Sequence, residues 1–348
     1  MAAQSTVAGP EPGTVGDLAW MTRAVGLADA VRGTTAPNPW VGAVAVTRSG
    51  ASYEGATAPP GGAHAEVAAI RRAAAAGDSL VGGTLYTTLE PCAHRGRTPP
   101  CVDAILAAGL GRVVVGVLDP DPHVAGRGVA ALEAAGVEVA VGIGADPVAE
   151  QLAAYLKHRR TGRPWVVLKL AATMDGRTAA PDGSSRWITG EEARRDAHRL
   201  RAVSDAVLVG AGTVRADDPE LTVRTTRDPD RQPLRVVLGP VPPGARVEPA
   251  VSLSGDLGDV LDELGRRGIL QVLVEGGARV AHAFHAAALV DGYVLYLAPA
   301  LFGGDDALPL FGGRGAPTID DVWRGRLLSV TRLGEDVRVE LAPATAAA

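Results

Sequence analysis

The chain alternates apolar runs of strand length with amphipathic segments of helix length, and this alternation limits it to α/β architectures. The elements predicted in the first half are, in order, a helix over 15–32, a strand at Val41–Val46, a helix at Glu66–Ala76, strands at Thr84–Leu89 and Val113–Leu118, a helix at Gly128–Ala135 and a strand at Val137–Val141. The residues expected on the buried face of the first helix are Leu18, Met21, Val25 and Ala28. Together these elements predict a layered α/β domain with a largely parallel or mixed sheet.

A second α/β pattern follows a connecting helix expected at Asp146–Arg160. It comprises strands at Trp165–Leu170, Ala206–Val209, Leu234–Leu238, Gln271–Val274, Tyr293–Ala298 and Leu327–Leu341, and helices at Glu191–Val203, Asp256–Arg267 and Ala278–Ala288. Because 348 residues exceed a typical single domain, two domains are expected, at 15–160 and 161–341. Residues 1–14 are expected to form a flexible extension and residues 342–348 a flexible tail, since both ends are rich in small residues.

Charge and hydropathy exclude several classes of protein. A net charge of −5 gives no overall attraction for nucleic acid. The chain has no apolar run of about 18 residues, which a transmembrane helix would need, and its first residues lack the basic and apolar segments of a secretory signal. We therefore expect a cytoplasmic protein that acts on a small molecule, without nucleic-acid or membrane partners. We also expect a homo-oligomer.

Both cysteines of the chain belong to one cluster of metal-ligand side chains. His64 and Glu66 are separated by one residue, Cys92 follows a proline, and Cys101 comes nine residues after Cys92. One imidazole and two thiolates leave the fourth position of a tetrahedral zinc ion open, which is typical of catalytic zinc. Glu66 is expected to move a proton from a zinc-activated water. The H-x-E…P-C pattern is the one that zinc-dependent nucleobase deaminases share.

Other interpretations of the cluster remain open at this point. The histidine and thiols could be incidental, or the zinc could be structural, with His94 as the only nearby candidate for a fourth ligand. Two cysteines this close could also pair, but the neighbouring histidine and glutamate favour a metal and a reducing compartment. His64 and Cys92 are both expected where loops enter helices, and backbone N–H groups there would favour thiolate over thiol.

The eight residues between the cysteines form a cationic loop that contains His94, Arg95 and Arg97. A basic loop at the mouth of such a site indicates an anionic substrate, such as a phosphorylated nucleotide, and the alternative is an ordinary solvated loop. Asn38 lies between two prolines. Its amide can donate to and accept from a pyrimidinone edge, although a turn-forming asparagine would explain the same residue.

The segment Leu89–Cys101 resembles the diagnostic segment of the bifunctional riboflavin-biosynthesis deaminase/reductase family. Further matches to that family, in the same order, are Pro37-Asn38-Pro39, Ala63-His64-Ala65-Glu66 and Asp119-Pro120. The resemblance implies a cytidine-deaminase-like three-layer domain that uses Zn²⁺ and acts on a pyrimidine ribose phosphate. The roles that it implies are zinc ligation by His64, Cys92 and Cys101, catalytic proton transfer by Glu66, and substrate contacts from Asn38, His94 and Arg97.

The second half contains glycine-rich turns but no dinucleotide-binding fingerprint of the Rossmann type. Gly210-Ala211-Gly212 follows a predicted strand, yet Arg215 occupies the place of the third glycine, and the residues after it break a helix. At Val274–Arg279, by contrast, a strand runs through two glycines into a helix. Its N–H groups could hold a phosphate with help from Arg279. A plain strand–turn–helix connection is the alternative.

The family resemblance continues through this half, in motifs that include Asp175-Gly176-Arg177, Ser184–Thr189 and Glu275-Gly276-Gly277. It implies a domain similar in fold to dihydrofolate reductase that uses NADPH. The substrate-lining residues that it implies are Ser185, Arg201, Leu221, Arg224 and Glu275. The cofactor-contacting residues that it implies are Ala171, Trp187, Thr213, Asp217, Gly277, Ala278 and Arg279. Lys169 and Asp175 are further candidates for the reductase cleft, although Lys169 at a strand end, like Arg201 and Arg224, could equally belong to the solvated surface.

These observations predict one chain with two activities. The first is zinc-dependent hydrolytic deamination of 2,5-diamino-6-ribosylamino-4(3H)-pyrimidinone 5′-phosphate, and the second is NADPH-dependent reduction of the ribosyl group to ribityl. One alternative is a tRNA or nucleotide deaminase with an unrelated second domain, against which the acidic balance weighs. The other is a deaminase whose reductase domain is impaired, because Gly239–Asp259 is short and rich in proline and glycine.

Overall fold

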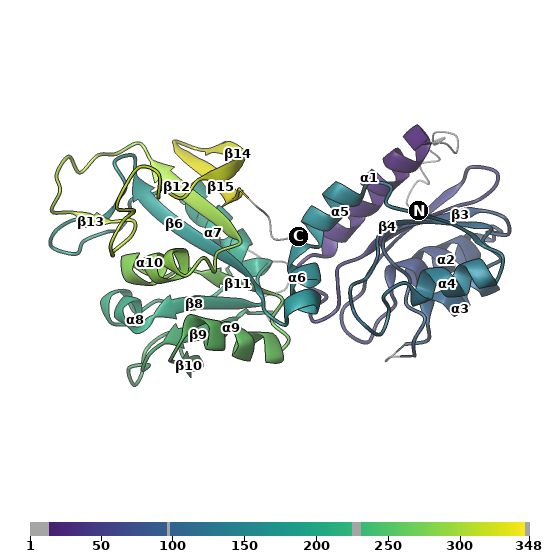
Figure 1. The fold of residues 1–348 in the computed structure, drawn as a ribbon, viewed down its shortest axis with the longest axis horizontal. Helices are drawn as coiled ribbons and strands as arrows, with labels where there is room; N and C mark the ends of the chain where they lie inside the picture. Colours follow the sequence, from purple (N-terminus) through teal and green to yellow (C-terminus); the bar gives the residue numbers. More distant parts are fainter. Residues whose placement is uncertain (1–13, 96–97, 225–230, 345–348) are drawn as a thin grey trace. The chain divides into compact units, whose positions relative to one another are not determined.

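The structure, a computed structural model, describes residues 14–344 apart from 96–97 and 225–230. The chain divides into two compact units, Met1–Gly162 and Arg163–Ala348, each with its own sheet (Figure 1). The expected extension lies outside the described residues except for Thr14, and the expected tail is described only over 342–344. The last strand continues to Pro343 and so enters the expected tail. Across the described ranges, no helix has the length and apolar character needed to cross a bilayer.

Unit 1 contains a five-stranded sheet between two layers of helices (Figure 1). Its strand order is β2 (Ser52–Ala56), β1 (Gly42–Val46), β3 (Thr84–Leu89), β4 (Arg112–Val117) and β5 (Glu138–Val141). β1 is antiparallel to both of its neighbours, whereas β3, β4 and β5 run parallel. The helices are α1 (Thr14–Val31), α2 (Ala65–Ala76), α3 (Cys101–Ala107), α4 (Arg127–Ala134), α5 (Ala145–Gln151) and α6 (Ala153–Thr161). α1 and α5 lie on one face of the sheet, and α2, α3 and α4 lie on the other (Figure 1).

Close packing of α2 on this sheet requires a glycine in β2. A Cβ on Gly55 would lie 2.0 Å from the carbonyl oxygen of Ala65 at the start of α2. The buried side of the helix consists largely of alanine, including Ala65, Ala69 and Ala73, so its backbone can approach the strands closely. This packing fixes the beginning of α2, and with it His64 and Glu66, relative to the sheet.

Unit 2 contains an eight-stranded sheet. Its strand order is β10 (Val251–Leu253), β9 (Leu234–Leu238), β8 (Ala206–Gly210), β11 (Gln271–Val274), β6 (Trp165–Thr173), β12 (Gly292–Ala298), β15 (Asp336–Pro343) and β14 (Gly325–Leu333). The strands from β10 to β12 run parallel, and the last two pairs are antiparallel. The helices are α7 (Glu191–Ala202), α8 (Ala211–Asp217), α9 (Leu257–Arg266) and α10 (Ala278–Ala286), and β7 (Arg177–Ala179) pairs separately with β13 (Leu308–Pro309).

Each face of this larger sheet has its own hydrophobic core. Leu264 of α9 and Phe284 of α10 pack on one face, and Ala193 of α7 packs on the other. Because side chains alternate between the faces of a strand, Tyr293 and Tyr296 of β12 belong to different cores. The two faces of β12 therefore have separate surroundings.

Several expectations about individual elements were wrong. The strand expected at Leu327–Leu341 is a hairpin of β14 and β15, which turns at Gly334 with a φ of 63°. The connecting helix expected at Asp146–Arg160 is interrupted at Leu152, whose ψ of 8° is not helical. β2 was missed because its sequence, Ser52–Ala56, has no apolar run. β10 and α3 were missed because they span only three and seven residues, which is too short for a clear hydrophobic period.

Of the residues expected on the buried face of α1, Met21 and Ala28 are buried and Val25 is half-buried, but Leu18 is not. Leu18 is exposed, and the neighbouring Asp17 is buried. The carboxylate of Asp17 accepts a hydrogen bond from the Tyr86 hydroxyl at 2.8 Å and two from Arg112 at 2.9 and 3.0 Å. A pattern that counts only apolar residues misses a carboxylate that is buried because it is paired.

Candidate functional sites

The three side chains expected to bind a metal converge in unit 1. His64 is the N-cap of α2, Cys101 is the first residue of α3, and Cys92 lies in the loop after β3. Their ligand atoms all lie within 4.8 Å of one another. Nδ1 of His64 is 3.2 Å from Sγ of Cys101 and 3.7 Å from Sγ of Cys92, whereas Nε2 is 3.3 Å from the Thr98 hydroxyl. Nδ1 is therefore the nitrogen that faces the two sulfur atoms.

The expectation that Cys92 lies where a loop enters a helix was wrong. The helix begins nine residues later, at Cys101, after the rigid pair Pro99-Pro100. The backbone N–H of Cys101 nevertheless points at Sγ of Cys92 across 3.4 Å. The beginning of α3 thus favours negative charge on the Cys92 sulfur.

The cluster shifts the pKa values of its own members. A hydrogen bond from the Cys101 thiol, aided by His64, lowers the pKa of Cys92 to about 4. The same contact, together with burial, raises the pKa of Cys101. Zinc binds thiolate and neutral imidazole, so its binding would release the remaining protons. One nitrogen and two sulfur atoms gathered this closely fit zinc with a coordination position open to solvent or substrate.

Glu66 lies in the first turn of α2, beside the metal-ligand cluster, and only 4% of its surface is exposed. Burial raises the pKa of its carboxyl group, while a backbone hydrogen bond and the charge of His64 oppose the shift. Its side chain also interacts with the Cys101 thiol. A carboxyl group that is more easily protonated than an ordinary glutamate is suited to accept and return a proton near neutral pH.

Glu90, which was not predicted as a site residue, links the start of the loop that contains Cys92 to the segment after β4. It is 3% exposed. Its carboxylate accepts four backbone hydrogen bonds, from Asp119 at 3.2 Å, Gly126 at 2.9 Å, Gly128 at 2.9 Å and Val129 at 3.2 Å. Gly128 is needed here because a Cβ would lie 1.9 Å from the carbonyl oxygen of Pro91. The signal that could have found Glu90 is a charged residue directly after a buried strand and before Pro91-Cys92.

The residues expected to contact the deamination substrate lie in two loops. Asn38 is half-buried in the turn before β1, where its N–H donates to the carbonyl of Thr35 at 2.9 Å and its carbonyl accepts from the Thr35 hydroxyl at 3.0 Å. His94 is exposed in the loop between the cysteines. Arg97 lies outside the described residues. The substrate contacts of all three stay predictions.

A charged cluster in unit 2 brings together three residues from separate elements. Arg201 of α7 donates to Glu275, which follows β11, through Nε at 2.5 Å and Nη2 at 3.0 Å. Nζ of Lys169 lies 3.9 Å from the same carboxylate, and the side chains of Lys169 and Glu275 are 18% and 8% exposed. Lys169 is inside β6 rather than at its end. The alternative in which Lys169 and Arg201 are solvated surface charges is therefore contradicted.

Burial and mutual pairing set the pKa values in this charged cluster. Burial lowers the pKa of Lys169, the charge of Glu275 opposes the shift, and the charge of Arg201 adds to it. Burial alone would raise the pKa of Glu275, but the charge and hydrogen bonds of Arg201 outweigh it and leave that pKa below its usual value. The cluster thus holds an ionised carboxylate beside a lysine that releases its proton more readily than a lysine in water.

The other residues expected to line the reduction substrate are placed differently. Leu221 is buried with a φ of 52°, and Arg201 donates to the carbonyl of the next residue, Thr222, at 3.2 Å. Leu221 therefore lies next to the charged cluster. Arg224 is exposed and donates to Glu220 at 2.7 Å, and Ser185 is half-buried in the segment before α7.

The structure brings two of the expected cofactor contacts together. The N–H of Gly277, at the N-cap of α10, donates to the Thr213 hydroxyl of α8 at 3.2 Å. Helix α8 was not expected, because the residues after Arg215 were predicted to break a helix. It ends at Asp217, where Asp218 adopts a left-handed conformation with a φ of 40°, so the helix-breaking residues define its end.

The remaining cofactor candidates surround this point or lie in the neighbouring loop. Ala278 and Arg279 form the first turn of α10, and Ala171 is half-buried in β6. Trp187 is exposed, with the guanidinium carbon of Arg194 4.7 Å from its ring centroid. The backbone carbonyl of Asp217 accepts from Arg186 at 2.7 Å.

Asp175, a candidate for the reductase cleft, is engaged by its own loop. Its carboxylate accepts from the N–H of Gly303 at 2.9 Å and from the Thr173 hydroxyl at 2.5 Å. These hydrogen bonds lower the pKa of the carboxyl group. A structural role in joining the two loops accounts for Asp175 in this structure.

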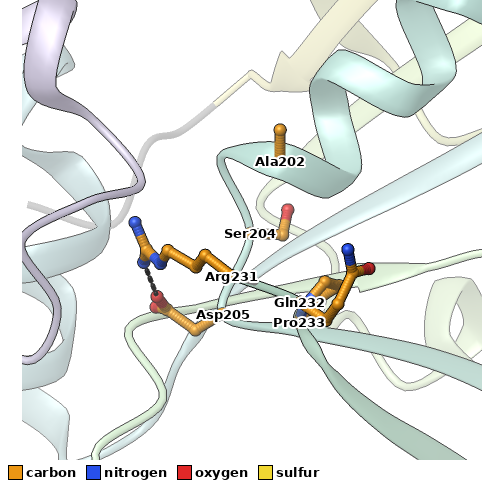
Figure 2. Close-up of a pocket in the computed structure, with 6 residues that line it drawn as sticks. All are labelled: Ala202, Ser204, Asp205, Arg231, Gln232 and Pro233. Carbon is orange, nitrogen blue, oxygen red and sulfur yellow. Dashed lines mark ion pairs between the residues drawn. The ribbon is translucent and has the colours of Figure 1, made fainter. Parts of the chain in front are cut away.

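Two surface hollows differ in their relation to these clusters. One, of about 790 Å³, runs along α2 and α3 between mostly apolar side chains, and its lining includes His64 of the metal-ligand cluster. The other, of about 70 Å³, adjoins an ion pair in which Arg231 lies 3.7 Å from Asp205 (Figure 2). Asp205 also accepts from the backbone N–H groups of Leu270 and Gln271 at 2.9 and 3.0 Å. The smaller hollow thus lies at a junction between strands, and its lining contains none of the predicted site residues.

Both units match known families. Residues 15–117 match the cytidine and deoxycytidylate deaminase zinc-binding region, and residues 164–339 match the RibD C-terminal domain. The riboflavin biosynthesis protein RibD of Mycobacterium tuberculosis is 44% identical over 327 residues, which cover 89% of this chain and 93% of that protein. The solved structure of Acinetobacter baumannii RibD, 38% identical, matches with a TM-score of 0.89 over 96% of this chain and 100% of its own.

A third match carries a longer functional name. The structure of the Thermotoga maritima diaminohydroxyphosphoribosylaminopyrimidine deaminase/5-amino-6-(5-phosphoribosylamino)uracil reductase has a TM-score of 0.85 at 34% identity, over 94% of this chain and 98% of its own. Together these matches confirm the expected deaminase-like fold of the first half and the expected reductase fold of the second.

Proposed function

We infer the work of each site from one premise: the chain belongs to the RibD family, the bifunctional deaminases and reductases of riboflavin biosynthesis. It is a zinc-dependent deaminase and an NADPH-dependent reductase in a single chain. We propose that its substrate is the diaminopyrimidinone ribosyl phosphate for which the Thermotoga maritima relative is named. The convergence of His64, Cys92 and Cys101 beside the buried Glu66 is the observation that carries the proposal.

In unit 1, Nδ1 of His64 and the sulfur atoms of Cys92 and Cys101 would hold the zinc. Zinc, when bound, supplies the Lewis acidity that activates water near neutral pH. Glu66 takes one proton from the attacking water and gives it to the ring nitrogen, and then moves the second proton, from the newly added hydroxyl group, to the amine, which leaves as ammonia. Its raised pKa supports both transfers.

The substrate-binding loops of unit 1 supply recognition. The amide of Asn38 pairs with the pyrimidinone edge. His94 and Arg97 contact the anionic substrate, because the loop between the cysteines is cationic. These assignments rest on the sequence motif and on the position of the two loops, and a phosphate-free substrate analogue with a much higher KM would support them.

In unit 2, Lys169 is the proton donor of the reduction. NADPH, when bound, supplies the hydride that reduces the ribosyl carbon. For that carbon to accept a hydride, its bond to the ring oxygen breaks while the attached nitrogen forms a double bond to it. The ring oxygen then needs a proton, which the buried ammonium of Lys169 gives. Glu275 and Arg201 orient the lysine and, with Ser185, Leu221 and Arg224, line the substrate.

The proposed NADPH site lies where β8 and β11 run into α8 and α10. The N-terminus of α10, with Arg279 exposed in its first turn, suits a phosphate group. Its proposed contacts are Ala171, Trp187, Thr213, Asp217, Gly277, Ala278 and Arg279. The donor set at this helix start fits an anionic dinucleotide.

A two-stage assay tests the whole proposal. Purified, zinc-loaded protein is given the diaminopyrimidinone ribosyl phosphate, and ammonia is followed without cofactor before NADPH is added. We expect one ammonia per substrate, followed by stoichiometric NADPH oxidation. Ammonia without NADPH oxidation would show an impaired reductase unit. No ammonia would contradict the substrate assignment, and a panel of nucleotides and tRNA would then identify the substrate.

We propose further that the chain forms a homo-oligomer through β14. In the described part of the chain, β14 is the outermost strand of its sheet, and its exposed residues include Leu327, Leu328 and Val330. An exposed apolar edge pairs readily with another chain, and a second copy offers the identical edge. Light scattering should show a dimer or larger assembly that Leu328→Glu weakens. A monomeric wild-type protein would contradict the proposal.

We also propose that the domains span 15–160 and 161–341 and that the enzyme acts in the cytoplasm. The ligand thiols of Cys92 and Cys101 are free, and a reducing compartment keeps them so. Separate expression of the two spans tests the boundaries, since each should fold cooperatively and retain its own activity.

A further inference from the structure

Lys169 lies against an aromatic ring from the neighbouring strand. Its Nζ is 5.7 Å from the ring centroid of Tyr296, which is within the range of cation–π attraction. In the pairing of β6 with β12, Lys169 lies opposite Val294 and Ala171 lies opposite Tyr296. Because side chains alternate along a strand, the ammonium and the ring project from the same face of the sheet. The ring of Tyr296 and the carboxylate of Glu275 thus both lie close to the ammonium of Lys169.

The ring of Tyr296 is held in place through its hydroxyl group. Tyr296 is 1% exposed, and its hydroxyl donates to Oδ2 of Asp196 in α7 at 2.7 Å. Arg338 of β15 lies 3.2 Å from the same oxygen. A hydrogen bond to a buried carboxylate is stronger than one between neutral groups, so the ring keeps one position relative to Lys169.

This arrangement is more costly than packing alone would need. A leucine or phenylalanine at position 296 would fill the core without requiring the buried carboxylate of Asp196, whose desolvation is unfavourable. The fixed ring therefore has a use beyond filling space, and the group that it faces is the ammonium of Lys169.

We propose that Tyr296 is a positioning residue for the reduction: its ring holds the ammonium of Lys169 toward Glu275 and the substrate, and Asp196 fixes the ring. The inference rests on the proposed role of Lys169 as proton donor. The groups that face Lys169 come from three elements, namely Glu275 after β11, Arg201 of α7 and the ring of Tyr296 in β12. Of these, only the ring supports the protonated lysine without carrying a charge.

The test compares Tyr296→Leu and Tyr296→Phe with a matched control from the same strand. Tyr293 is also buried in β12, but it belongs to the opposite core, and its hydroxyl is 2.8 Å from Nδ1 of His285. Tyr293→Phe therefore removes a buried hydroxyl without touching the charged cluster. The full-length, zinc-loaded chain is used throughout, so ammonia release provides an internal measure of unit 1.

Tyr296→Leu should lower kcat for the reduction about tenfold and move the basic limb of its pH profile to lower pH, because the protonated lysine loses the support of the ring. The Kd for NADPH and the rate of ammonia release should stay within about twofold of wild type. Tyr296→Phe keeps the ring and the volume of the core but loses the hydrogen bond to Asp196, so a smaller fall in kcat, about threefold, is expected. Tyr293→Phe should change neither kcat nor the pH profile.

An unchanged kcat and pH profile in both Tyr296 variants would overturn the inference. So would an equal loss in Tyr293→Phe, because the effect would then be one of general stability. Lys169→Met separates this inference from the one on which it rests. If Lys169→Met leaves the reduction intact, the proposed proton donor is wrong. If Lys169→Met abolishes reduction and both Tyr296 variants are normal, only the role of Tyr296 is wrong.

Discussion

Glu275→Gln would remove one charge from the buried cluster of unit 2 while keeping the size of the side chain. Arg201 would lose the partner that it contacts at 2.5 and 3.0 Å, and Lys169 would lose the carboxylate 3.9 Å away. Because the Glu275 side chain is only 8% exposed, little water can enter to solvate the cations that lose this carboxylate. Breaking a buried pair of this kind costs about 3–5 kcal/mol. We expect unit 2 to lose about 3 kcal/mol of its free energy of unfolding.

The loss should depend on pH in a defined direction. The pKa of Glu275 is below its usual value, so its contribution to stability is present above the unfolded pKa and disappears as the pH falls through the folded one. The difference between wild type and Glu275→Gln should therefore be complete at pH 7 and shrink below about pH 4.3. The reduction should also slow, since Lys169 loses the negative charge that opposes the lowering of its pKa by burial.

Thermal unfolding at several pH values measures the first effect, and NADPH oxidation with the deaminated substrate measures the second. Ammonia release by unit 1 should be unchanged. Glu220→Gln is the control: Glu220 pairs with Arg224 at 2.7 Å and with Arg246 on the surface, and its loss should destabilise the protein much less, because surface pairs are screened by solvent. If Glu275→Gln matched Glu220→Gln in stability and in reduction, the argument from burial would be refuted.

Three further variants test unit 1. Asp17→Asn removes the charge paired with Arg112, which lowers the pKa of Asp17; it should cost about 2 kcal/mol in thermal unfolding at pH 7, and the difference should fade below about pH 4. Glu90→Gln turns an amide N–H toward backbone donors, so it should weaken zinc binding in a chelator competition and slow ammonia release. NADPH-dependent reduction of the deaminated substrate should stay normal. A zinc affinity equal to that of wild type would contradict the role of Glu90. Gly128→Ala would place a Cβ 1.9 Å from the carbonyl of Pro91, so it should lower the melting temperature of unit 1 by several degrees, and a normal melting curve would show that the loop yields without cost.

The sequence predicts the metal-ligand cluster because its chemistry is local. His64 and Glu66 share one short motif, and the spacing of Cys92 and Cys101 needs no knowledge of the fold. The alternation of predicted strands and helices also predicts the two α/β domains. The pattern of apolar residues cannot identify the partner of a buried charge. For this reason it places Leu18 on the buried face of α1, where the structure instead buries Asp17.

The reductase cluster shows why the remainder needs a structure. Arg201 and Glu275 are 74 residues apart, and Lys169 precedes both. They meet because β11 lies beside β6 in the sheet, while α7 packs on the face from which they project. The same topology puts Tyr296 beside Lys169. No local motif contains these four residues, so their contacts follow only from the order of the strands.

The central claim is that His64, Cys92 and Cys101 would hold a zinc ion and that Glu66 accepts a proton from the attacking water. Glu66→Gln tests it most directly, with zinc content, ammonia release and NADPH-dependent reduction of supplied deaminated substrate measured on the same preparation. The account predicts one zinc per chain, no ammonia above background and normal reduction. Ammonia release at the wild-type rate with zinc in place would contradict it.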